Sequence, residues 1–132
     1  MRDRPGGAYD RRGTDDVPPR PGIEWVYIPS KLAGQEICRI FAEHYGLSVP
    51  TLAFCQFVST AIEPDKPLYP LSVSWEDSAR AVRAALEVDK LPHAYEFFHI
   101  GTDLPHGTFS TEKAMDLPNW QPQDRLEAFY VR

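Results

Sequence analysis

Residues 31–58 read KLAGQEICRIFAEHYGLSVPTLAFCQFV, and the expected fold class rests on this stretch. Between Lys31 and Tyr45, apolar side chains recur at near-helical spacing among charged and amide side chains, which predicts a helix. Gly46 follows as the expected stop, because glycine readily adopts the left-handed conformation in which many helices end. Residues 49–58 are almost continuously apolar, as in a parallel strand covered on both faces. A helix, a tight turn and a buried strand together predict an α/β fold.

Further helices and strands are predicted to alternate along the rest of the chain. Residues 59–72 are rich in proline and are expected to form a loop. Ser74 and Asp77 have the spacing of a capping box, a hydroxyl answered three residues later by a carboxylate, so a second helix is expected to begin here. That helix is expected to end near Val88 and to have apolar positions at Ala79, Val82, Ala85 and Leu86. A strand is expected over 95–100. Two short helices are expected after it, one over 110–117 that Pro118 stops and a final one over 124–130.

The predicted order of helix, strand, helix, strand, helix is an incomplete α/β layout. Two strands are too few for an open parallel sheet, and the strand over 49–58 would have exposed edges. Residues 1–22, in which glycine, proline and charged residues alternate, are expected to be a flexible segment ahead of a domain over 23–132.

Composition and charge limit the class of protein. The 132 residues are 42% hydrophobic and carry a net charge of −5, which fits a soluble globular chain and argues against nucleic acid, since nucleic-acid binding needs a basic surface. No apolar run approaches the roughly 20 residues of a membrane span, and the charged N-terminus does not look like a signal peptide. We therefore expect a cytoplasmic protein with no membrane partner.

Several chemically suggestive side chains are expected to have ordinary roles. Cys38 and Cys55 form no metal or redox spacing, so free thiols are the simplest interpretation, although a disulfide between them remains open. The histidines match no common ligand pattern, so no metal site is expected. Trp75 and Trp120 are expected in packing, Arg80 and Arg83 on a solvated helix face, and Ser30 as a helix cap.

Residues 27–35 (YIPSKLAGQ) resemble the Tyr-x-x-x-Lys motif and following helix of the extended short-chain dehydrogenase/reductase family, the NAD(P)-dependent sugar epimerases and dehydratases. The other stretches that agree in order are PPRP at 18–21, SVSWEDSARAVRAALEV at 72–88, FFHIG at 97–101 and STEKAMDLPNWQP at 110–122. The resemblance implies a partial Rossmann-like (doubly wound) fold that lacks its N-terminal nucleotide-binding strands. At 72–88 it implies a strand that leads into a helix.

The same resemblance implies a catalytic pair. Tyr27 would be the general acid/base, and Lys31 would favour the phenolate and bind the nicotinamide ribose of NAD or NADP. The substrate would be a nucleotide sugar or a sugar acid, with His106 as a candidate contact. Pro29 lies between the pair, so the helix is expected to start at or after it. The motif alone favours a simpler interpretation, in which Tyr27 and Lys31 are an amphipathic tyrosine and a solvated lysine at a helix start. Only together with the other stretches that agree in order does it favour descent from a catalytic pair.

The glycine-rich turn that holds the dinucleotide in this family does not occur in the sequence. Gly6-Gly7 has neither a strand before it nor a helix after it. We therefore expect a fragment, a truncated product or half of a split enzyme, inactive alone and binding NAD(P) no tighter than millimolar. Its partner would be a second copy, through the helix of Tyr27 and Lys31, or a complementing N-terminal half. The alternative is a noncatalytic interaction or remnant domain that keeps the fold but not the chemistry.

Overall fold

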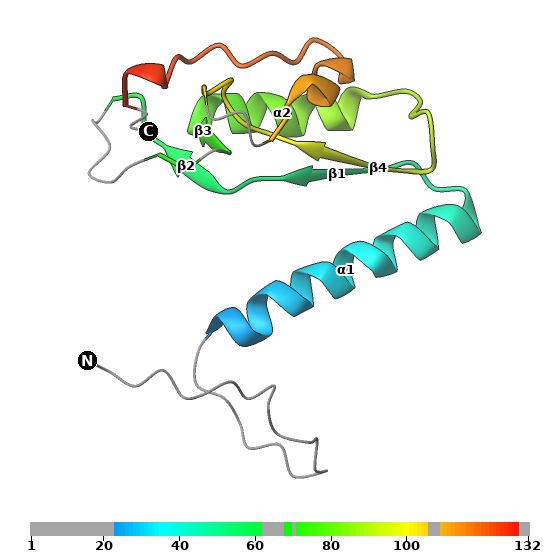
Figure 1. The fold of residues 1–132 in the computed structure, drawn as a ribbon. Helices are drawn as coiled ribbons and strands as arrows, with labels where there is room; N and C mark the ends of the chain where they lie inside the picture. The colour runs from blue at the N-terminus through cyan, green and yellow to red at the C-terminus, as the bar shows by residue number, and fades with distance from the viewer. Residues whose placement is uncertain (1–22, 62–67, 70, 106–108, 130–132) are drawn as a thin grey trace, which may run out of the picture. The chain divides into compact units, whose positions relative to one another are not determined.

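The computed structural model describes residues 23–61, 68–69, 71–105 and 109–129 (Figure 1). The segment 1–22 that was expected to be flexible and the candidate substrate contact His106 lie outside these residues. The described residues form a mixed α/β structure, which confirms the expected class. Its elements are α1 (Ile23–Tyr45), β1 (Val49–Ala53), β2 (Gln56–Val58), β3 (Ser72–Ser74), α2 (Trp75–Glu87), β4 (Tyr95–His99) and the 3₁₀ helices η1 (Glu112–Asp116) and η2 (Glu127–Phe129).

The chain divides into two compact units, Met1–Gly34 and Gln35–Arg132, and α1 runs from one into the other. Helix α1 begins at Ile23, so the expectation that it starts at or after Pro29 is wrong. Its predicted end is confirmed, because Gly46 has a φ of 66°, in the left-handed region that favours glycine.

The strands form two parallel pairs, β1 with β4 and β2 with β3. The single strand predicted over 49–58 is therefore two strands, interrupted at Phe54 and Cys55, because its halves have different neighbours. Beyond β4, the Ile100 amide donates to the Ala53 carbonyl at 3.0 Å, which continues the first pairing. The register sets Val49 against Tyr95, Ala53 against His99, Gln56 against Ser72 and Val58 against Ser74.

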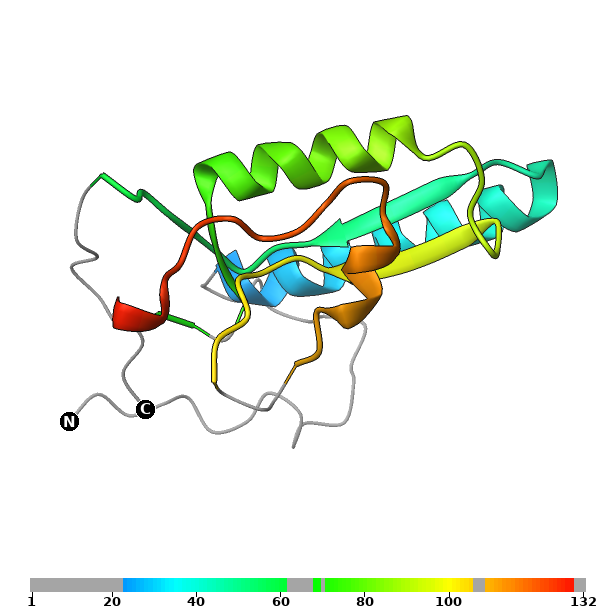
Figure 2. The same ribbon diagram turned by 90° about the horizontal axis from the view of Figure 1, so that it is seen from above.

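Helix α2 begins at the predicted Ser74 cap and lies along one face of the strands (Figures 1 and 2). The Asp77 carboxylate does not complete a capping box, because it bonds to Arg80 and to the amides of Gln123 and Asp124. The Ser74 hydroxyl accepts a hydrogen bond from the Asp77 amide at 2.8 Å. Strand β3 leads directly into this helix, as the resemblance implies. The expected apolar positions do not face the core, however: Val82 and Leu86 are exposed, and the buried residues are the smaller or polar Asp77, Ser78, Ala81 and Ala84.

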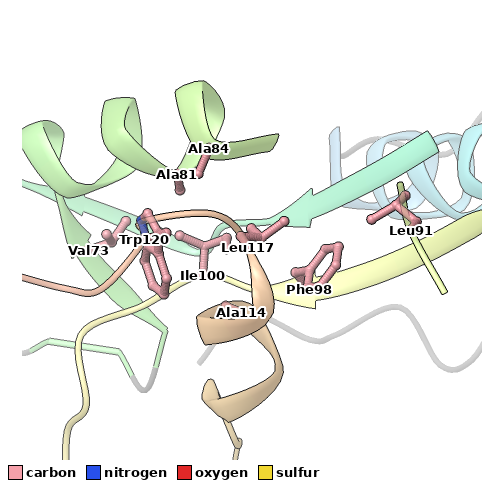
Figure 3. Packing of buried hydrophobic residues seen from close by; sticks show 9 residues of the cluster. All are labelled: Val73, Ala81, Ala84, Leu91, Phe98, Ile100, Ala114, Leu117 and Trp120. Carbon is pink, nitrogen blue, oxygen red and sulfur yellow. The ribbon is translucent and has the colours of Figure 1, made fainter. Parts of the chain in front are cut away.

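The main core lies between α2, the strands and the C-terminal segment (Figure 3). Trp120 is buried, and its indole N–H donates to the Asp77 carbonyl at 3.2 Å, so its expected packing role is confirmed. Small Ala81 and Ala84 let the helix approach the large core side chains. The cluster comprises Val73, Ala81, Ala84, Leu91, Phe98, Ile100, Ala114, Leu117 and Trp120.

The two C-terminal helices predicted from the sequence are shorter than expected. The segment 110–117 holds a five-residue 3₁₀ helix, η1, and the segment 124–130 holds the three-residue η2. Such short segments gain too few hydrogen bonds to offset the cost of starting an α-helix. Buried Ala114 in η1 and buried Leu126, just before η2, anchor these segments to the core clusters instead.

Candidate functional site

Tyr27 and Lys31 lie together on α1. The Lys31 ammonium nitrogen is 5.3 Å from the centroid of the Tyr27 ring, within the range of a cation–π contact. This contact follows from their spacing, because residues four apart on a helix are neighbours on its surface. Tyr27 is 54% exposed.

The helix is regular on both sides of Pro29, which lies between the two residues. The predicted cap role of Ser30 is wrong, because Ser30 lies inside α1, where its hydroxyl donates to the Tyr27 carbonyl at 2.7 Å. Proline at position 29 removes the backbone donor to the carbonyl four residues earlier, that of Trp25. The Ser30 hydroxyl does not replace this bond, because it donates to a different carbonyl. Tyr27 is therefore positioned by continuous helix and does not depend on a flexible approach to the helix start.

A second feature is an open cavity of about 580 Å³ in the unit Gln35–Arg132. Its lining residues follow β4 in the sequence. Parallel α/β proteins commonly bind ligands beyond the carboxyl ends of their strands. Carboxylate, hydroxyl and apolar groups line the cavity, a mixture that can hydrogen-bond hydroxyl groups and cover a carbon skeleton. Its described lining residues are Asp103, Leu104, Phe109, Ser110, Thr111, Glu112 and Met115.

Asp77 forms a buried charged cluster that the sequence did not predict. Its carboxylate accepts from the Arg80 guanidinium at 2.6 Å and from the backbone amides of Gln123 at 2.9 Å and Asp124 at 3.0 Å. The bond to Asp77 raises the pKa of Arg80 above its usual value. The prediction of a solvated side chain is therefore wrong for Arg80, which bonds to buried Asp77, and is confirmed for Arg83, which is exposed. The carboxylate is fully occupied within the protein, so this cluster holds the structure together.

Glu96 forms a second cluster, on β4. Only 6% of the residue is exposed, and its carboxylate bonds to Nδ1 of His93 at 2.6 Å and to the ammonium of Lys113. The bonds from Lys113 and then from His93 lower the pKa of the Glu96 carboxyl, against the opposing effect of burial. Lys113 belongs to η1, so this cluster joins η1 to the sheet.

Within the ranges that the structure describes, neither a metal centre nor a membrane-spanning helix is found. No three His, Cys, Asp or Glu side chains gather there as metal ligands. None of the helices described is both long enough and apolar enough to cross a bilayer. Cys38 and Cys55 are free and exposed, which confirms the simplest interpretation of these thiols.

The structure therefore brings Tyr27 and Lys31 together, and both stay predictions as catalytic residues. His106 is not among the described residues, although cavity residues flank it in the sequence at 103–104 and 109–112. The chain matches no family model, no curated protein and no solved structure.

Proposed function

We propose that this chain contributes the catalytic tyrosine and lysine of an NAD(P)-dependent oxidoreductase or epimerase that acts on a nucleotide sugar or sugar acid. The observation that carries this proposal is the 5.3 Å contact between the Lys31 ammonium and the Tyr27 ring on one face of α1. In this scheme the Tyr27 hydroxyl exchanges a proton with the substrate oxygen. The Lys31 ammonium favours the phenolate and binds the nicotinamide ribose, and the nicotinamide supplies or accepts the hydride.

The arrangement of elements supports a partial Rossmann-like fold as part of this proposal. Both strand pairs are parallel, and α2 lies against their strands. Separately, within the unit Gln35–Arg132, the polar and apolar lining of the cavity is of a kind that binds polyhydroxylated ligands.

In this proposal, Tyr27 and Lys31 would meet only the nicotinamide end of a dinucleotide. In this family a glycine-rich turn at a helix N-terminus holds the pyrophosphate, and no G-x-x-G-x-x-G motif occurs in the sequence. We assign that role to another polypeptide segment, either a complementing N-terminal half or a partner held through α1. Exposed apolar side chains on α1 support such a contact: Val26, Leu32, Ile37, Ile40 and Phe41.

The second candidate function is a noncatalytic interaction domain. The same exposed apolar side chains favour it, because a surface of this kind marks a binding face whether or not Tyr27 acts on a substrate.

Titration of the isotopically labelled chain with NADH and with NADPH tests the first candidate. We expect a dissociation constant of about 1 mM or weaker, with amide shifts confined to α1 around Tyr27 and Lys31. Lys31→Met should remove these shifts, whereas Lys90→Met, at another exposed lysine, should leave them unchanged.

Two outcomes of this titration would count against nucleotide binding at Lys31, and a third would count against the assignment of the pyrophosphate to another segment. If neither nucleotide shifts α1 at about 10 mM, the noncatalytic function is favoured. If the shifts persist in Lys31→Met, the nucleotide binds elsewhere. A micromolar dissociation constant would instead mean that the chain has its own complete nucleotide site.

A further inference from the structure

Helix α2 has a second, outward face that is apolar. Trp75, Val82 and Leu86 are 59%, 46% and 83% exposed, and Ala79 lies between them on the same line of the helix and is also exposed. We call these four residues the outer stripe. Their spacing of four, three and four residues is the spacing of the seam along which two helices pair. The buried face, with Ala81 and Ala84, already holds the helix on the core, so the outer stripe is not needed there.

Aromatic side chains extend the outer stripe onto the neighbouring strand. The Phe57 ring stacks on Trp75, with centroids 5.1 Å apart and planes 17° apart, and Phe54 lies 5.3 Å from Phe57. Phe57 is itself 43% exposed. An apolar surface that continues across two elements is typical of an interaction site, whereas isolated exposed apolar residues are ordinary.

Opposite charges border one flank of the outer stripe. Glu76 and Arg83 are seven residues apart, two turns along the same side of α2. Glu76 forms no ion pair within the described residues, and Arg83 bonds only to exposed Glu87 at 2.7 Å, so both can meet a partner. A surface with one positive and one negative group at this spacing is complementary to itself after a two-fold rotation.

We propose that α2 pairs with α2 of a second copy of this chain, in antiparallel orientation. Trp75 then faces Leu86 of the other copy and Ala79 faces Val82, while Glu76 faces Arg83; the two-fold axis repeats each contact. A parallel pair would place the two charges against the opposite flank, where Ser78 and Ala85 are uncharged. The proposal does not rest on the enzymatic function.

The contact has only about three helical turns, which is small for a stable interface, so we expect a reversible dimer with a dissociation constant of roughly 10–100 μM. Sedimentation equilibrium of the full chain over a range of concentrations measures it. The variants Glu76→Arg and Arg83→Glu should each weaken the dimer about tenfold, because two facing ion pairs become two like-charge pairs. An equimolar mixture of the two variants should recover the original affinity as a heterodimer, since attraction returns at both sites.

Two comparisons keep the result decisive. Leu86→Glu should abolish the dimer without unfolding the chain, because this side chain is largely exposed, and circular dichroism checks the fold. Ile40→Glu, on exposed α1, should leave the α2 dimer unchanged. The proposal is overturned if the chain stays monomeric at about 1 mM, if the mixture recovers nothing, or if only Ile40→Glu weakens association.

Discussion

At the scale of the residue, Asp77 is the buried carboxylate on which the C-terminal segment depends. It accepts hydrogen bonds from Arg80 and from the amides of Gln123 and Asp124, with no exposed surface of its own. Asp77→Ala leaves the amides of Gln123 and Asp124 without their acceptor and leaves the Arg80 guanidinium with only its 3.3 Å bond to the Asp124 carboxylate, which should lower the free energy of unfolding by about 3 kcal/mol. Urea unfolding followed by tryptophan fluorescence measures the loss.

The neighbouring acid Glu76 is the matched control for this prediction. It lies in the same first turn of α2 but is exposed, so Glu76→Ala should change the free energy of unfolding by no more than about 0.5 kcal/mol. Equal losses in the two variants would mean that the helix-end charge matters and that the bonds of Asp77 do not.

Glu96 predicts how stability responds to acid. Its pKa is lowered in the folded chain by Lys113 and His93, so its ionised form stabilises the fold above the ordinary carboxyl pKa. That contribution is lost as the pH falls through the lowered pKa. Glu96→Gln should therefore be less stable than the parent at pH 7 and lose less stability between about pH 5 and pH 3. Urea midpoints across this range test it, with exposed Glu112→Gln expected to follow the parent curve.

At the scale of the element, substitution by alanine should have opposite effects at two glycines, one inside α1 and one directly after it. Gly46 ends the helix with a φ of 66°, and Gly34 lies inside it; an added Cβ at either position meets nothing within 4 Å. Gly46→Ala should cost about 1 kcal/mol through its backbone conformation alone, whereas Gly34→Ala should stabilise the helix by about 0.5–1 kcal/mol. Helicity and thermal midpoints by circular dichroism check both signs; the same sign at both sites would contradict this account.

The local chemistry of a helix end was predictable, whereas the partners of an element were not. The Gly46 stop and the Ser74 cap follow from backbone conformation and a bond three residues away. The strand break at Phe54 and Cys55 contains no glycine or proline that could have predicted it. It occurs where the neighbouring strand changes, from β4 beside β1 to β3 beside β2. Periodicity likewise found an apolar stripe on α2 but could not show that small Ala81 lies on the side that packs.

The same distinction applies to the candidate site. The proximity of Tyr27 and Lys31 is a property of one helical turn, so their spacing predicted it. Asp77 bonds to Gln123 and Asp124, which lie 46 and 47 positions further along the chain. The donors are backbone amides, which every residue except proline has, so the side-chain types could not predict these bonds. Pro29 predicts a helix boundary from its local chemistry alone, but α1 begins earlier, at Ile23, and continues through Pro29.

At the scale of the whole molecule, burial is unevenly distributed between the helices. Helix α2 buries Ala81 and Ala84 against the main core, whereas the described side chains of α1 are almost all exposed, with Ala42 the buried exception. An isolated helix is marginally stable in water, because packing supplies most of the stability of helices in proteins. The stability of the chain should therefore differ between its two helices.

Hydrogen exchange measures that difference directly. At a concentration where the chain is monomeric, amides over 26–33 should exchange at least about 100-fold faster than those of Ala81 and Ala84, because opening α1 exposes little new apolar surface while opening α2 disrupts the core. Ile40→Glu should leave the ratio unchanged in the monomer. If the amides over 26–33 become protected as the concentration rises, so that the ratio of the two exchange rates falls, α1 would be identified as a contact between copies. Equal protection in the dilute chain would instead contradict the uneven stability argued from burial.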